Sequence, residues 1–186
     1  MKAICVKELM IPLEEYATVD KDATIYDALL ALEKAQENFN QSQYTHRAIL
    51  VYEGDRIVGK IDMTDWIQGL EPGYAHIRNM QKEEFAYGGF KGFIRSMAEA
   101  HNLWEKPMND ICRKGANFKV KDIVKTPTEG EFVNQEDTLD QAVHQLIMGC
   151  YQSLLVTGDN DNDIVGILRL TDVFSSISDI MKACDL

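Results

Sequence analysis

The chain has 186 residues, of which 45% are hydrophobic and 26% are charged, a composition typical of a globular protein that can bury a core. Its net charge of −11 argues against a nucleic-acid partner, because an acidic surface repels phosphodiester backbones. No apolar run approaches the ~20 residues of a membrane span, and the N-terminal stretch Met1–Cys5 does not have the pattern of a signal peptide. We therefore expect a cytoplasmic protein without a membrane partner.

The cysteines and histidines are too scattered to build a zinc site, a disulfide framework or a catalytic triad. The chain has no Cys-x-x-Cys pair, and no histidine has the neighbours that a metal site or an activated nucleophile needs. The residues concerned are Cys5, Cys112, Cys150, Cys184, His46, His76, His101 and His144. We predict no catalytic residue, no metal ligand and no required cofactor, and therefore a protein that is not an enzyme.

An internal repeat organises the chain, because four sequence blocks recur in the same order. The first-copy blocks are Val6–Met10, Val19–Thr24, Ala48–Val51 and Ile57–Asp65, and their counterparts are Val120–Val124, Val133–Thr138, Ser153–Val156 and Ile164–Asp172. The first two pairs lie 114 positions apart and the last pair 107. Duplicated blocks indicate duplicated structural units. We therefore divide the chain into a first repeat (1–70), an insertion (71–119) and a second repeat (120–186).

In the first repeat, apolar residues recur at helical spacing from Ile25 onward, and Thr24 stands where a hydroxyl can cap the first helical turn. Two apolar strands follow, Ala48–Tyr52 and Ile57–Ile61, with a polar hairpin turn between them. A short closing helix is predicted after Thr64-Asp65.

The insertion contains apolar and aromatic residues at helical spacing, which predicts an amphipathic helix over about 92–104, ended by Lys106-Pro107. The residues of this face are Phe90, Phe93, Ile94, Met97 and His101, and a second, weaker helix would hold Tyr74, Ile77, Met80 and Phe85. These side chains either cover exposed edges of the repeats or form a docking surface or a lid over the cleft. We favour the covering role, since aromatic residues usually pack.

The second repeat follows the same order, with a helix after Thr138, strands at Ser153–Thr157 and Ile164–Leu168, and a closing helix after Thr171-Asp172. Between its strands, three alternating aspartates look like the start of a calcium loop, but isoleucine replaces the required glycine and leucine the required glutamate. We interpret this stretch, 158–163, as a solvated turn. A unit of this size is marginal alone, so the two repeats must pack their sheets against each other.

These blocks resemble a pair of cystathionine-β-synthase-type (CBS) domains. The family's signature is a strand with a glycine, two apolar residues, a Ser/Thr, any residue, often another Ser/Thr, and an Asp that opens a helix. Gly59–Asp65 and Gly166–Asp172 match it at the glycine, the second hydroxyl and the aspartate. The resemblance covers roughly 1–70 and 118–186. It implies an α/β (α+β) fold of two β-α-β-β-α repeats packed with pseudo-two-fold symmetry around a cleft, with a helical insertion between them.

The resemblance also implies a site for an adenosine compound such as AMP, ADP, ATP or S-adenosylmethionine. Asp65 and Asp172 would accept hydrogen bonds from the ribose hydroxyls, and Thr64 and Thr171 with first-turn amides would face phosphate. Adenine would lie between apolar strands. Its expected contacts are the backbone near Thr18, Val19, Phe132 and Val133 and the side chains of Ile49 and Leu154.

The chain departs from the signature at the first Ser/Thr, which is Asp62 in one copy and Arg169 in the other. A carboxylate repels phosphate, whereas a guanidinium can bind it through two hydrogen bonds. We therefore expect the Arg169 half to be the better phosphate site. The Asp62 half would accept an uncharged adenosine moiety, a cation, or nothing.

Several interpretations remain open on the sequence alone. The Thr-Asp pairs could simply cap the closing helices. The chain could be a dimeric interaction scaffold that binds no nucleotide, or a divalent-cation sensor that uses Asp62, Asp65 and Asp172. Our preferred interpretation is an allosteric regulatory module that forms a homodimer and acts on a separate effector protein, since no effector domain is recognisable in the sequence.

Overall fold

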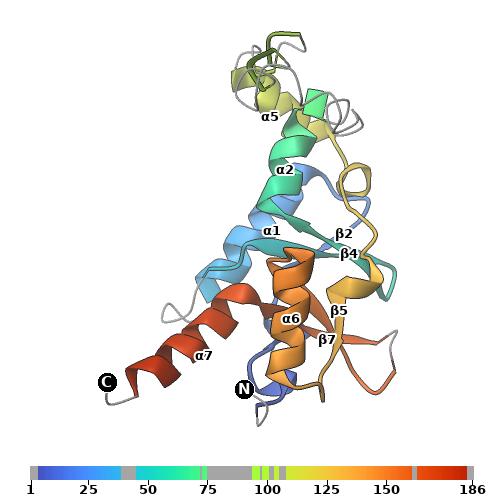
Figure 1. Ribbon diagram of the computed structural model, residues 1–186. Coiled ribbons are helices and arrows are strands. Elements are labelled where there is room, and N and C mark those ends of the chain that lie inside the picture. The colour runs from blue at the N-terminus through green and yellow to red at the C-terminus, as the bar shows by residue number, and fades with distance from the viewer. Residues whose placement is uncertain are drawn as a thin grey trace.

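The computed structural model describes residues 4–38, 45–71, 73–74, 94–96, 98–100, 103–104, 108–160 and 163–183. The first repeat comprises β2 (Thr18–Asp20), α1 (Ile25–Asn38), β3 (Ala48–Glu53), β4 (Arg56–Asp62) and α2 (Met63–Leu70). The second comprises β5 (Phe132–Asn134), α6 (Leu139–Gly149), β6 (Ser153–Thr157), β7 (Ile164–Arg169) and α7 (Leu170–Lys182). Both therefore have the predicted strand–helix–strand–strand–helix order (Figure 1).

The two sheets have the same register, which confirms the duplication. In each, a short strand pairs in parallel with the middle strand, and the middle strand pairs antiparallel with the last. Val51 lies opposite Gly59 in the first sheet, and Val156 lies opposite Gly166 in the second. The register shifts immediately after each valine, so even the irregularity of the hairpin is repeated.

Three apolar clusters show how the repeats are packed. Because successive side chains of a strand point to opposite faces, Ile49 in β3 packs toward the helices of its own repeat while Leu50 packs toward the other sheet. Leu154 and Leu155 in β6 divide in the same way. The shared cluster between the sheets consists of Ile11, Tyr16, Leu50, Leu155 and Ile167. The expected face-to-face packing is confirmed.

The segments that precede the repeats are exchanged between them. The N-terminal strap, residues 4–12, contains η1 (Val6–Glu8) and packs on the second repeat, where the Val6 amide donates to the Asp137 carbonyl at 2.9 Å. The linker strap, residues 119–128, contains η4 (Val120–Asp122) and packs on the first repeat, where the Val120 amide donates to the Ala23 carbonyl at 2.9 Å. Val6 and Val120 are both fully buried. The two repeats therefore hold each other by a mutual exchange.

Each strap crosses the glycine of the opposite signature. An added Cβ would lie 2.5 Å from the Lys125 carbonyl oxygen at Gly59, and 2.6 Å from the Ile11 carbonyl oxygen at Gly166. Real Cβ atoms do not approach backbone so closely, so a side chain at either position would push the strap away. The N-terminal strap forms strand β1 (Ile11–Pro12), which pairs with β7, whereas the linker strap is joined to β4 by an isolated bridge between Lys125 and Lys60. This difference gives one sheet four strands and the other three.

The insertion is described only in part. Residues 94–96 and 98–100 are helical, in agreement with the predicted helix, while Phe90, Phe93, Met97, His101, Ile77, Met80, Phe85 and Lys106-Pro107 lie outside the described residues. Helix α5 (Met108–Asn117) was not predicted; it leads into the linker strap and lies beside α2 (Figure 1). Its Lys114 donates to the Leu70 carbonyl at the end of α2 at 2.8 Å. No described helix combines the length and the apolar character that crossing a membrane requires.

Candidate functional site

The two signatures meet where the last strands of the sheets end. Asp62 and Arg169 occupy equivalent positions, opposite Ala48 in the first sheet and Ser153 in the second. A cavity of about 130 Å³ opens between them. Its walls include Tyr16, Arg47, Lys60, Asp62, Glu131, Tyr151, Ser153, Arg169 and Thr171. The cavity is therefore lined by side chains from both repeats.

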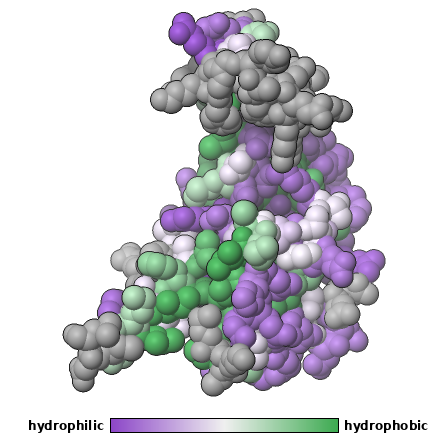
Figure 2. Space-filling view, viewed as in Figure 1, coloured by the Kyte–Doolittle hydropathy of each residue, from purple (hydrophilic) through white to green (hydrophobic). Residues whose placement is uncertain are grey.

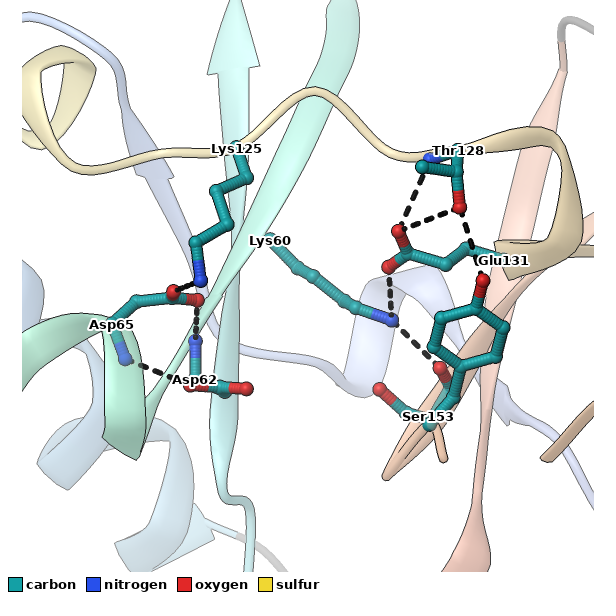
Figure 3. A network of polar contacts seen from close by, with 8 residues as sticks. Lys60, Asp62, Asp65, Lys125, Thr128, Glu131 and Ser153 are labelled. Carbon is teal, nitrogen blue, oxygen red and sulfur yellow. Dashed lines mark hydrogen bonds and ion pairs between the residues drawn. The ribbon is translucent and has the colours of Figure 1, made fainter. Parts of the chain in front are cut away.

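In the first half of the site, Asp62 and Asp65 cap helix α2 together. The Asp65 amide donates to Asp62 Oδ1 at 2.8 Å, and the Asp62 amide donates to Asp65 Oδ2 at 3.1 Å. This reciprocal arrangement is a capping box. The buried Asp65 carboxylate also forms an ion pair with Lys125 from the linker strap (Figure 3). The capping role that the sequence left open is confirmed here, and it takes up a first-turn amide that was expected to face phosphate.

In the second half, Asp172 makes a different contact. The Arg169 guanidinium donates from Nε to Asp172 Oδ2 and from Nη2 to Asp172 Oδ1, both at 2.6 Å. Arg169 is the residue before α7, but its side chain, which has no hydrogen-bond acceptor, does not cap this helix end. The side chains of Arg169 and Asp172 are only 5% and 16% exposed, so this two-pronged pair is largely shielded from water. The expectation that Arg169 binds phosphate remains a prediction; in this structure its guanidinium binds the Asp172 carboxylate, with which a phosphate would have to compete.

A lysine from the first repeat crosses the interface next to the cavity. Lys60 Nζ donates to the Ser153 carbonyl at 2.6 Å and lies 3.0 Å from Glu131 Oε2 (Figure 3). Burial raises the pKa of Glu131, but hydrogen bonds from Thr128 and the Lys60 charge outweigh it, and the pKa lies below the ordinary value. Glu131 therefore stays ionised and holds Lys60 between the repeats.

An aromatic pair closes the other wall. The rings of Tyr16 and His46 meet edge to face with centroids 4.5 Å apart, and both residues are buried. Burial, with a smaller contribution from the Arg169 charge, lowers the pKa of His46 to about 4, while burial raises the pKa of Tyr16. His46 is therefore neutral at physiological pH.

The predicted adenine contacts are not brought together. Ile49 and Leu154 are fully buried in the clusters between each sheet and its helices, so their side chains are not available to a ligand; this expectation is corrected by the alternation of the strands. Phe132 and Val133 line a separate open groove of about 1310 Å³ near the hairpin turns. Thr18 and Val19 line neither cavity. Thr64 is exposed, and Thr171 is half-buried in the cavity wall.

The residues that sequence reasoning missed are the ones that neutralise the site: Lys60, Lys125 and Glu131. Two of them could have been recognised from the sequence, because Lys60 is equivalent to Ile167 in the repeat and Lys125 is equivalent to Ile11. A lysine at a position that is apolar in the sister copy indicates a charge that needs a local partner. Within the described part of the chain, no three His, Cys, Asp or Glu side chains are placed to hold a metal ion.

Comparisons with known proteins agree with the fold of two paired repeats. The family model of the CBS domain matches residues 6–71 and 120–179. No curated protein sequence matches the chain. Among solved structures, a CBS domain-containing protein of unknown function from Bacillus anthracis superposes with a TM-score of 0.62 at 18% identity, covering 96% of this chain and 95% of that chain.

Two further structures were solved with nucleotides. The CBS domain of a bacterial CNNM/CorC family Mg²⁺ transporter in complex with ATP has a TM-score of 0.57 at 17% identity, covering 95% of this chain and 89% of that chain. CBSX2 in complex with AMP has a TM-score of 0.56 at 15% identity, with coverages of 95% and 98%. At these identities the likeness concerns the fold.

Proposed function

The chain belongs to the CBS-domain family, and on that premise we propose that it is a non-catalytic regulatory pair that binds an adenosine-containing ligand in the inter-repeat cleft. Ligand binding would favour one arrangement of the repeats and so transmit a signal to a partner protein. The structures of a transporter CBS domain with ATP and of CBSX2 with AMP support this ligand class. Candidate ligands are AMP, ADP, ATP, S-adenosylmethionine and adenosine itself.

One observation carries the proposal: each signature carboxylate lies in the first turn of a helix, three residues after a side chain (Asp62 or Arg169) that lines the shared cavity, and each is held by a cation. A carboxylate has two acceptor oxygens and can receive both ribose hydroxyls. In the proposed complex, the ribose replaces the present partner of Asp65 or Asp172. The adenine would extend beyond the cavity wall toward the backbone of Thr18 and Val19 or of Phe132 and Val133, which do not line the cavity.

Charge separates the two halves as hosts for phosphate. In the first half, Asp62 and Asp65 face Lys125, and Lys60 is already paired with Glu131. This half carries no excess positive charge, so it suits an adenosine moiety better than a polyphosphate. In the second half, Arg169 could accept phosphate only by giving up Asp172.

Isothermal titration calorimetry with the five candidate ligands tests the proposal. We expect heat of binding for at least one ligand, with affinity reduced about tenfold or more by removal of the carboxylate that holds the ribose. Asp65→Asn is the conservative variant, because asparagine can still accept the Asp62 amide and caps nearly as well. Its melting temperature serves as the control for folding. Absence of heat for every ligand would contradict the proposed function.

A nucleotide-independent interaction scaffold is the second candidate. It is supported by the fact that both carboxylates already have internal partners, which satisfies their charge without a ligand. A divalent-cation sensor has less support, because Lys125 and Arg169 occupy the oxygens that a cation would need. That candidate requires a rise in melting temperature with Mg²⁺ or Ca²⁺ that Asp62→Asn removes.

We also propose a homodimer and a protein partner, supported by exposed apolar side chains on several helices. Ile67 on α2 and Phe174 on α7 occupy equivalent positions and are 52% and 61% exposed. Figure 2 shows hydrophobic side chains gathered along α7. Light scattering of the wild type and of Phe174→Glu tests the dimer, since a charge in an apolar interface should shift the mass toward that of a monomer. A wild type that is monomeric at high concentration would contradict it.

A further inference from the structure

The two signature carboxylates differ in how firmly their internal cation is held. Asp172 is bound by the arginine three residues earlier in the same strand-to-helix turn, through two hydrogen bonds and with little exposure of either side chain. Asp65 is bound by a lysine from the linker strap, and the Lys125 side chain is 50% exposed while that of Asp65 is 6% exposed. An ammonium group that makes one contact and is half exposed to water is easier to displace than a buried guanidinium that makes two hydrogen bonds.

The backbone of Lys125 is fixed although its side chain is not. Lys125 bridges to Lys60 in β4, and its carbonyl oxygen lies 2.5 Å from the position that a Cβ of Gly59 would take. The strap therefore keeps the amine permanently next to Asp65, at a high effective concentration. Its four-carbon stem can still turn into the solvent without moving the strap.

From this asymmetry we infer that Lys125 is a tethered counter-ion of Asp65, which an adenosine ligand must displace to bind the first half of the site. Arg169 keeps the second half closed, so one ligand binds per chain. The inference rests on the proposed function and adds its regulation: the linker strap competes with the ligand for one carboxylate. Lys125 is a positioning and competing residue, not a ligand contact.

The internal repeat supports this division of roles. The counterpart of Lys125 is Ile11, which is buried between the sheets, and the counterpart of Arg169 is Asp62. Each half thus has one cation for its signature carboxylate, but the first half takes it from the strap and the second from the signature itself. A strap-borne cation links ligand binding to a segment that connects the insertion to the second repeat. Figure 3 shows Lys125 reaching from that segment to Asp65.

The ion pair can be tested without a ligand by the rate at which an amine-reactive ester acylates Lys125, measured by mass spectrometry. We expect Asp65→Asn to raise the Lys125 rate about two- to fivefold, because the amine loses its carboxylate partner. Lys121 in the same strap pairs with Asp22 and is the internal reference, whose rate should not change. Equal Lys125 rates in the wild type and the variant would overturn the inference.

The competition is tested with adenosine, which carries no phosphate that could attract the released amine. We expect Lys125→Met to raise adenosine affinity about two- to fivefold in calorimetry, with Lys121→Met unchanged. We also expect one site per chain, and faster Lys125 acylation when adenosine saturates the wild type. Binding that leaves both the Lys125 rate and the Lys125→Met affinity unchanged would overturn the displacement. If adenosine binds neither protein, the proposed function and the displacement fail together, and the ligand-free acylation alone decides the ion pair.

Discussion

In the first repeat, the signature carboxylate shares in the cap of its helix and takes its counter-ion from a distant segment. In the second, it takes its counter-ion from the arginine three positions earlier, whose side chain does not cap the helix. The hairpin registers are the same in the two repeats, and each strap passes over the signature glycine of the opposite repeat, although the straps differ in how they pair. The difference therefore arises from a few side chains placed on one scaffold. It shows how a duplicated fold can keep two sites structurally alike while making them chemically unequal.

The same contrast extends across the interface. Where the first repeat places Lys60 and the segment before β5 places Glu131, the sister positions hold Ile167 and Ala17, both buried. One half therefore has a charged contact between the repeats and the other an apolar one. Four predictions test this difference between the two halves of the molecule.

The largest effect is expected from Arg169→Met, which leaves Asp172 without its partner in a mostly buried position. Breaking such a pair from one side should lower the free energy of unfolding by about 3 kcal/mol. Urea denaturation measures this loss. The matched control is Arg169→Met together with Asp172→Leu, which removes both charges and should restore most of the stability. A single variant as stable as the wild type would show that the second half is not locked by this pair.

The second prediction concerns acid sensitivity, which the first half has through His46. Its counterpart in the second repeat is Tyr151, so that half has no histidine at this position. Since the pKa of His46 is lowered to about 4 in the folded protein, the unfolded chain binds a proton first as the pH falls. Stability is therefore lost between about pH 6.5 and 4, by roughly 1–3 kcal/mol.

Thermal unfolding at pH 7 and pH 4.5 measures this loss. His46→Phe keeps a ring against Tyr16 but cannot accept the proton, so its melting temperature should fall less over the same interval. Glu131 contributes little over this interval, because its pKa is lowered from an ordinary value of 4.5 and the stability linked to it is lost mainly below pH 4.5. Identical pH dependence of the two proteins would exclude His46 as the source.

The sequence predicted the repeated architecture, because strand and helix periods and the order of the blocks depend on local patterns. All four hairpin strands were placed within one residue of their observed ends, while the closing helices begin at Met63 and Leu170, before the Thr-Asp pairs. At Thr24, the hydroxyl accepts the Asp27 amide at 3.0 Å as expected, and it also donates to Asp27 Oδ2. The Thr138 hydroxyl likewise donates to the side-chain oxygen of Gln141, so both helices begin with a capping box.

The unpredicted features depend on contacts distant in sequence. The exchange of the straps could not be foreseen, since Val6 and Val120 look like the first elements of their own repeats. Helix α5 is short and mostly polar, and its Lys114 donates to the end of α2. The pairing of Lys125 with Asp65 joins residues that only the folded chain brings together. Pattern reasoning identifies which residues share a face, but it does not identify partners across an interface.

The third prediction compares the two strap crossings through Gly59→Ala and Gly166→Ala. Each new Cβ would meet a strap carbonyl and should destabilise the fold by roughly 1–3 kcal/mol. We expect the larger loss at Gly166, because its strap is a paired strand with Ile11 buried between the sheets, whereas the strap at Gly59 is joined to β4 by an isolated bridge. Urea denaturation of both variants decides the order. A larger loss at Gly59 would mean that the linker strap is the more firmly held of the two.

The smallest effect is expected when the first half is given the apolar contact of the second. Lys60→Ile together with Glu131→Ala copies the sister positions and removes both charges of the interface pair, so stability should change by no more than about 1 kcal/mol in either direction. Lys60→Ile alone is the control, and it should be clearly less stable because Glu131 keeps its charge without Lys60. Denaturation of the three proteins completes a comparison in which only the pair is altered. If the double variant is as unstable as the single one, Lys60 stabilises the fold mainly through its hydrogen bond to the Ser153 carbonyl. In that case the apolar contact of the second half cannot replace the charged contact of the first.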